Sequence, residues 1–272
     1  MTRPLQRFSQ QVVGDVTVCY SGGLDSTTVA YLAAKQNKGR IHLFTLDHGY
    51  GYLFNRWSKR TSRTLARAIG EERVIHRIAN THPLHKTLGI DTVLADRRRY
   101  GQWFGCCLAC TMSMITEAVI YNLERKIPHI MMGSSVGGQY AVMSMPVVIE
   151  LQKEFCGRYG VIYSAPLLDD VIVKDQERAT LEAAGIFRGK RFLDKHSFGN
   201  QGYCLLSLQH LPDVLFNVHD SYDSAKVRAF YLDKRSQCED YVEEYFRRTN
   251  QPIEPLIERL RELWPEDEGA IP

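Results

Sequence analysis

One short segment combines residues that favour phosphate binding with a residue that opposes it. Residues 21–26 read SGGLDS and lie between a β-branched, apolar run at 12–20 and a small-residue, apolar run at 27–36. A glycine-rich turn between a strand and a helix binds phosphate through backbone N–H groups and the positive end of the helix dipole. Asp25 inside such a turn would repel phosphate. The loop is therefore either a plain turn capped by Ser or Asp, or a phosphate site whose acid has a separate task.

Cysteines form a second chemical signal. Cys107 and Cys110 have C-x-x-C spacing at the expected start of a helix, where thiolates gain from the helix dipole, and Cys204 follows 94 residues later. Three cysteines fit a site with one open metal position, whereas structural zinc prefers four ligands, with Cys106, His196 or His210 available as the fourth. A persulfide carrier with a resolving thiol is another interpretation, and small buried residues at a helix start are the plainest one.

The surrounding pattern predicts the elements that must position these residues. Strands are expected at 12–20, 40–50, 72–79, 129–135 and 160–168, with helices over 27–36, 59–70 and 110–126 between them. Strands alternating with helices favour an α/β fold with a parallel five-stranded sheet and helices on both faces, whose ligands bind at the carboxyl ends of the strands. Helices expected at 173–186, 224–248 and 252–264 make the carboxyl-terminal part mainly helical. We therefore divide the chain into residues 1–170 and 171–272.

The SGGLDS loop resembles that of the PP-loop ATP pyrophosphatases, the adenine nucleotide alpha-hydrolase-like family with a HUP-like fold. It lacks the Lys-Ser/Thr ending of a Walker loop. TLDHGYG at 45–51 and PLLDDVIVKDQERATLEAAGI at 166–186 extend the resemblance over residues 12–186, whereas GSSVGGQYA at 133–141 departs from the pattern of thiolating members. The resemblance implies a site that holds the β and γ phosphates of ATP, with Asp25 on Mg²⁺. The implied cofactor-binding residues are Ser21, Gly22, Gly23, Leu24, Asp25, Ser26, Asp47, His48 and Gly133.

The same resemblance gives the cysteines a role. A subgroup of PP-loop tRNA thiolases holds a [4Fe–4S] cluster on three cysteines, and Cys107, Cys110 and Cys204 are similar to that set. The implied catalytic residues are Asp25 and these three cysteines, with zinc or a cysteine persulfide as the alternatives to the cluster. The implied activity is that of an ATP-dependent sulfurtransferase, which adenylates a carbonyl oxygen, releases pyrophosphate and replaces the oxygen with sulfur.

Two other functions remain open. A deazaguanine nitrile synthase-like ligase would use ammonia and a structural zinc, and a non-catalytic module would only bind nucleotide. The acceptor is expected to contain a nucleobase, as tRNA or as a free nucleotide, because the residues Arg97, Arg98, Arg99, Tyr100, Trp103 and Phe104 could hold an anion and stack a base. Lys174 and Lys226 could approach phosphate.

Composition limits the setting of this chemistry. The 272 residues are 44% hydrophobic and carry a formal net charge of +3, a mild basic bias that suits phosphate ligands without indicating a dedicated nucleic-acid binder. The polar start has no signal-peptide pattern, and the sequence suggests no membrane span. We expect a cytoplasmic protein with no membrane partner, which could form a homodimer and would take sulfur from a donor protein or from sulfide.

Overall fold

The chain is described by a computed structural model covering residues 4–50, 55–135, 142–187, 204, 206 and 222–264. Its strands are β1 Val16–Cys19, β2 Ile41–Asp47, β3 Val74–Asn80, β4 His129–Met132 and β5 Ile162–Ser164. They form one sheet in the order β3-β2-β1-β4-β5, and every neighbouring pair is parallel. The predicted α/β fold with a parallel five-stranded sheet is confirmed.

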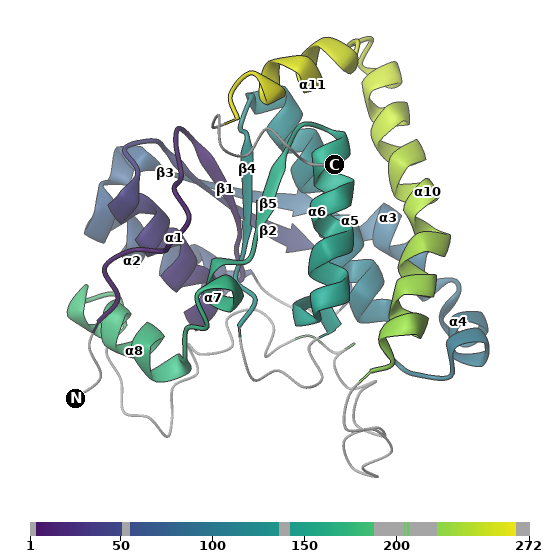
Figure 1. Cartoon of the computed structure of the whole chain (residues 1–272), viewed down its shortest axis with the longest axis horizontal. Helices are drawn as coiled ribbons and strands as arrows, with labels where there is room; N and C mark the ends of the chain where they lie inside the picture. Colours follow the sequence, from purple (N-terminus) through teal and green to yellow (C-terminus); the bar gives the residue numbers. More distant parts are fainter. Residues whose placement is uncertain are drawn as a thin grey trace.

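Helices connect and extend these strands. They are α1 Leu24–Gln36, α2 Arg56–Ile69, α3 His82–His85, α4 Val93–Tyr100, α5 Gly105–Arg125, α6 Pro146–Arg158, α7 Pro166–Asp169, α8 Lys174–Ala183, α10 Ser224–Arg248 and α11 Glu254–Arg261. In Figure 1, α1, α2 and α8 lie on one side of the sheet and α5, α6 and α10 on the other. Helix α8 packs on α1, and α10 packs on α5 and α6. The division at residue 170 stays a prediction.

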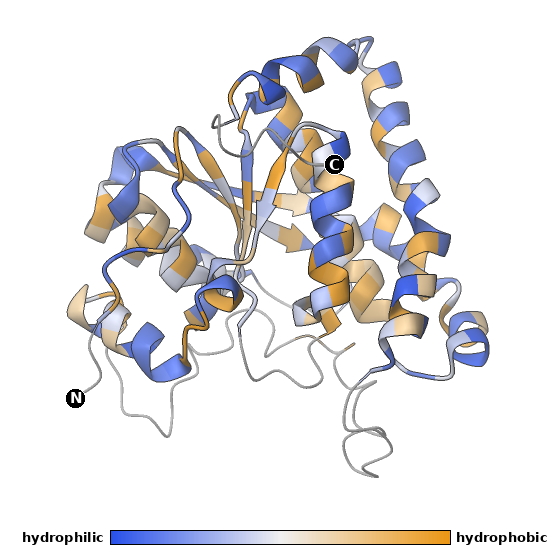
Figure 2. Cartoon of the chain, viewed as in Figure 1, coloured by the Kyte–Doolittle hydropathy of each residue, from blue (hydrophilic) through white to orange (hydrophobic). Residues whose placement is uncertain are grey.

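Two hydrophobic clusters fill the space between the sheet and its helices. One includes Val16, Val18 and Leu43 with side chains from α1 and α8, and the other includes Phe44 and Met132 with side chains from α5, α6 and α10. Figure 2 shows hydrophobic residues concentrated in the strands and along α5, while α8 and α11 present many polar residues. The sheet is therefore buried on both faces, as expected for parallel strands.

Helix α5 lies in the middle of one of these layers. By length and composition it could cross a membrane, which differs from the expectation that the sequence contains no such stretch. Its most apolar 18-residue window is, however, 78% buried inside the protein. The apolar character of α5 is thus used for packing against the sheet and α10.

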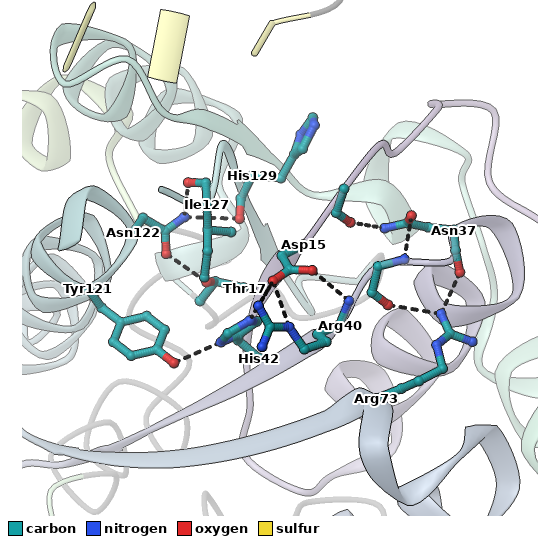
Figure 3. A network of polar contacts seen from close by, with 12 residues as sticks. Asp15, Thr17, Asn37, Arg40, His42, Arg73, Tyr121, Asn122, Ile127 and His129 are labelled. Atoms are coloured by element: carbon teal, nitrogen blue, oxygen red, sulfur yellow. Dashed lines mark hydrogen bonds and ion pairs between the residues drawn. The ribbon is translucent and has the colours of Figure 1, made fainter. Parts of the chain in front are cut away.

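Polar contacts tie the amino-terminal edge of the sheet together (Figure 3). Asn122 of α5 accepts a hydrogen bond from the Thr17 hydroxyl at 2.6 Å and donates to the carbonyls of Ile127 and His129 at 2.9 and 3.1 Å. Asp15 accepts bonds from the backbone N–H and the guanidinium of Arg40. These contacts stabilise the amino-terminal end of the sheet. Functional residues are expected at the opposite end, in the loops that follow the carboxyl ends of the strands.

His129 gives the fold a pH-sensitive position. Its side chain is 1% exposed, and neither ring nitrogen has a hydrogen-bond partner among the described residues. Burial lowers its pKa to about 4. A histidine whose folded pKa lies below its unfolded value stabilises the fold while neutral, and this contribution is lost as the pH falls below about 6.5.

We therefore predict that His129→Leu reduces the acid sensitivity of folding. Between about pH 7 and pH 5, the free energy of unfolding of the wild type should fall by about 2 kcal/mol more than that of the variant. Urea denaturation of both proteins at the two pH values measures this difference. Equal losses in the two proteins would show that His129 is protonated equally in the folded and unfolded states.

Candidate functional site

The SGGLDS loop connects β1 to α1 at the carboxyl edge of the sheet. The hydroxyl oxygens of Ser21 and Ser26 lie 3.3 Å apart, and the Ser26 hydroxyl accepts a bond from the Ser21 backbone N–H at 3.3 Å. Gly23 is the N-cap of α1, and no side chain caps the first turn of the helix. The loop thus gathers two hydroxyls at the positive end of a 13-residue helix, an arrangement suited to an anion. Leu24 is 1% exposed, so its side chain belongs to the core.

Two glycines allow backbone segments to approach this loop closely. Gly22 has a φ of +76°, and a Cβ atom there would lie 2.7 Å from the Cα of Ser58 at the start of α2. Gly133 follows β4, and a Cβ atom there would lie 2.7 Å from the backbone nitrogen of Ser26. Contacts this short exclude any side chain, so the SGGLDS loop can lie against α2 only because residue 22 is glycine, and the segment after β4 can approach Ser26 only because residue 133 is glycine.

Asp25 projects from the first turn of α1 into a polar cluster. Its carboxylate accepts a hydrogen bond from the Ser135 hydroxyl at 2.9 Å and forms an ion pair with Lys174 of α8. Lys174 also donates to Ser135 at 2.8 Å and lies 3.4 Å from the buried carboxylate of Glu177. Sequence reasoning pointed to Asp25 and Lys174 but missed Ser135 and Glu177. The only signals for these two were the position of Ser135 after the fourth strand and a Lys-x-x-Glu spacing.

A cleft opens beside the loop. It contains about 690 Å³ of space unoccupied by protein atoms, including open solvent at its mouth. One wall is formed by the loop and the ends of β1, β2 and β4, and the other by α5. The lining residues are Cys19, Tyr20, Ser21, Gly23, Asp25, Ser26, Thr45, Leu46, Cys110, Thr111, Met114, Met132, Gly133 and Met143. Cys110 therefore shares a cleft with the SGGLDS loop.

Asp47 and His48 lie at the end of β2. The Asp47 carboxylate accepts a bond from the Gly49 N–H at 3.2 Å and so shapes the turn. His48 is fully buried, and burial together with the nearby His85 lowers its pKa to about 4. Its Nδ1 accepts the Tyr50 N–H at 3.0 Å, so the neutral ring carries its proton on Nε2, which lies 3.7 Å from the sulfur of Cys204. Neither side chain lines the cleft.

The structure brings Cys204 near the cysteines of α5. Burial raises the pKa of Cys110 well above its usual value, and the neighbouring thiols of Cys107, Cys204 and Cys106 raise it further. This differs from the expected gain from the helix dipole, because burial outweighs it. Cys106 is buried, its thiol donates to the Gly89 carbonyl at 3.6 Å, and its pKa is raised to about 11 by burial, Asp96 and Cys204.

Thiols are chemically suitable ligands for an iron–sulfur cluster or zinc. Within the part of the chain that is described, however, no three His, Cys, Asp or Glu side chains are arranged to hold a metal ion. Cys107, Cys110 and Cys204 thus supply suitable donor atoms without forming a closed ligand set. His196 and His210, the other candidate ligands, lie outside the described residues.

The basic residues singled out in the sequence have mixed surroundings. Arg97 lies over the Trp103 ring, with its guanidinium carbon 5.2 Å from the ring centroid. Arg99 pairs with Asp233 at 2.6 Å. A Cβ atom at Gly101 would lie 3.5 Å from the Lys226 ammonium, so Lys226 lies beside the end of α4.

One comparison with protein families covers the part of the chain that contains the SGGLDS loop. Residues 7–117 match the family described as asparagine synthase. No curated protein matches the sequence. Among solved structures, the U34-tRNA thiolase NcsA from Methanococcus maripaludis, with its [4Fe–4S] cluster, matches at 12% identity and a TM-score of 0.39, over 82% of this chain and 72% of that one. A likeness this low says nothing about the substrate of this chain.

The SGGLDS loop follows the first strand of a five-stranded parallel sheet, Gly22 and Gly133 allow the close backbone contacts around it, and it lies within the matched residues. Residues 7–117, which contain the loop, thus match a family of the PP-loop ATP pyrophosphatase superfamily.

Proposed function

We propose that this protein is an ATP-dependent sulfurtransferase that acts on a nucleobase-containing acceptor. The observation that carries the proposal is the shared cleft, in which Cys110 faces the same space as Ser21, Asp25 and Ser26. Members of the superfamily use ATP, and a thiol beside the ATP loop supports sulfur as the second reactant. The gathering of Cys106, Cys107 and Cys204 around Cys110 supports the same reading.

The first step would activate the acceptor. Its carbonyl oxygen attacks the α phosphorus of ATP, an O–P bond forms, the bond between the α phosphorus and the bridging oxygen breaks, and pyrophosphate leaves. Backbone N–H groups at the start of α1 and the hydroxyls of Ser21 and Ser26 would hold the leaving group. Mg²⁺ bound at Asp25 would neutralise charge on the phosphates. Cys110 lies across the same cleft and would face the activated carbon.

The second step would replace oxygen with sulfur. Hydrosulfide attacks the carbon bearing the O–AMP group, a C–S bond forms, the C–O bond breaks, and AMP leaves with a proton released. Cys107, Cys110 and Cys204 would deliver that sulfur, either as ligands of a [4Fe–4S] cluster or as a persulfide carrier that an external thiol then reduces. His48 Nε2–H faces Cys204 and would stabilise negative charge on its sulfur.

A cytoplasmic location belongs to the same proposal. None of the seven cysteines, all of which lie in the described residues, forms a disulfide bond, as expected in a reducing compartment. The sulfur would come from a donor protein or from sulfide, and the acceptor would be tRNA or a free nucleotide.

The first prediction from this proposal concerns Asp25→Asn. An amide cannot supply the anionic oxygen that Mg²⁺ requires, so pyrophosphate release should fall by at least about a hundredfold while ATP still binds. Radiolabelled ATP resolved into AMP, ADP and pyrophosphate measures this effect. The exposed Asp240→Asn on α10 is the matched control. ADP and orthophosphate as wild-type products would contradict the proposed cleavage between the α and β phosphates.

The second prediction concerns the cysteines. Serine at Cys107, Cys110 or Cys204 should abolish sulfur incorporation, with ATP binding changed by less than about twofold, because none of these thiols is needed to hold the triphosphate. The control is Cys238→Ala, which changes a buried cysteine of α10. Iron, zinc and sulfane sulfur are measured in anaerobically purified proteins. Zinc retained by the wild type without sulfur transfer would favour the ammonia-using ligase.

The third prediction separates the acceptors. If tRNA is the acceptor, its binding requires several phosphate contacts, and affinity should fall by more than about tenfold between 50 and 200 mM salt because counterions are released (approximate values). Fluorescence titration with total tRNA measures this fall. An affinity that does not change with salt would contradict tRNA and point to a free nucleotide.

A further inference from the structure

A lysine ammonium lies between two carboxylates beside the nucleotide loop. Lys174 begins α8 and contacts Asp25 of α1, while its ammonium lies 3.4 Å from Glu177 one turn further along α8. Ser135, after β4, bridges the pair by donating to Asp25 and accepting from Lys174. Three elements that are distant in the sequence thus surround one positive charge.

Glu177 is an unusual residue for a helix that packs on the core. Its side chain has no exposed surface, and neither carboxylate oxygen accepts a hydrogen bond from the described residues. A buried carboxylate without hydrogen bonds is costly, and a hydrophobic residue would pack there at lower cost. Stability therefore does not explain Glu177, whose carboxylate faces the Lys174 ammonium at 3.4 Å and would be available for a ligand once that ammonium moves away.

The charge and mobility of the three groups indicate what that ligand is. The carboxylates of Asp25 and Glu177 lie on either side of the Lys174 ammonium, so the position between them already accommodates a positive charge. Mg²⁺ is commonly bound through one or two carboxylates together with substrate phosphates. The Lys174 side chain is 44% exposed on a flexible stem, whereas Glu177 is fixed by burial. Lys174 can therefore leave this place, and Glu177 cannot.

We propose that Asp25 and Glu177 together bind the divalent cation that enters with ATP, and that Lys174 occupies this place in the nucleotide-free protein and turns to the phosphates when the cation arrives. The proposal depends on ATP use by the protein and is independent of sulfur transfer. In the proposal, Lys174 pairs with the two carboxylates in the nucleotide-free protein and with the phosphates in the nucleotide-bound protein.

This exchange predicts that metal and nucleotide bind synergistically. A free divalent cation must displace the ammonium from Asp25 while the ammonium gains no phosphate in return. With the triphosphate present, the displaced ammonium finds a new anionic partner. Each ligand should therefore strengthen the binding of the other by the same factor.

Mn²⁺ and α,β-methylene-ATP, which is not cleaved between the α and β phosphates, test this proposal without turnover. Electron paramagnetic resonance measures free Mn²⁺ with and without the analogue. Wild-type protein should bind Mn²⁺ at least about tenfold more tightly when the analogue is present. Absence of this gain would overturn the proposal, whether or not the protein transfers sulfur.

Two variants test the two roles separately. Glu177→Gln should weaken Mn²⁺ binding in the presence of the analogue by at least about tenfold, yet change analogue binding in EDTA by less than about twofold. Lys174→Met should strengthen the binding of Mn²⁺ alone by about tenfold, because no ammonium competes. Glu182→Gln, at an exposed position of α8, is the control and should match the wild type.

Wild-type affinity for Mn²⁺ in Glu177→Gln with the analogue would overturn the role of Glu177. Unchanged binding of Mn²⁺ alone by Lys174→Met would overturn the role of Lys174. Thermal denaturation establishes that each variant is folded, and if Glu177→Gln unfolds, Glu177→Asp takes its place. Its shortened carboxylate should weaken Mn²⁺ binding while sparing the metal-free analogue.

Discussion

Close backbone contact around the SGGLDS loop is the constraint on which the site depends. The loop lies against the start of α2 at Gly22, while Gly133 after β4 approaches the first turn of α1. These positions admit no Cβ atom without displacing backbone, so the loop has little freedom to shift. The neighbours of β1 in the sheet are β2 and β4, and the chain crosses to opposite faces from this point. A crevice at the carboxyl ends of the strands follows from that topology.

The two walls of the cleft differ in electrostatics. On one wall, Asp25 contacts an ammonium group and a hydroxyl, as expected where phosphates and a cation are handled. On the other, α5 presents Cys110 among apolar side chains such as Met114, and burial raises the pKa of that thiol. A buried thiol is a poor nucleophile until its charge is compensated by a metal or a neighbouring donor. The polar wall thus suits nucleotide activation, and the thiol wall suits a sulfur reaction sheltered from water.

The strands and the loop could be predicted from the sequence because their signals are local. β-Branched apolar runs and a glycine pair before a helix depend on near neighbours, and the predicted helix over 224–248 coincides with α10. Helix α5 begins at Gly105, ahead of the predicted residue 110, so the cysteines lie inside its first turns. Helices α4 and α6 were not predicted. Helix α4 carries three consecutive arginines and is fixed by tertiary contacts, including the ion pair of Asp96 with Lys234 at 3.3 Å.

The surroundings of the site were less predictable, because they arise from contacts between distant residues. Ser135 and Lys174 meet at Asp25 although 39 residues separate them from each other, and no local pattern encodes that meeting. The approach of Cys204 to His48 spans 156 residues. C-x-x-C spacing indicated a shared direction for two thiols, but it could not show that burial would set the pKa of Cys110. Local sequence thus indicated the candidate reactive groups, and the tertiary structure determines their protonation and partners.

The origin of the oxygen atoms in AMP tests the central claim most directly. The protein is incubated with ATP, sulfide and either total tRNA or a pool of nucleotides in water enriched in oxygen-18, and the AMP is analysed by mass spectrometry. If a carbonyl oxygen of the acceptor attacks the α phosphorus, AMP acquires that oxygen and contains no label from water. AMP labelled by water, or ADP as the product, would contradict adenylation of an acceptor by this site.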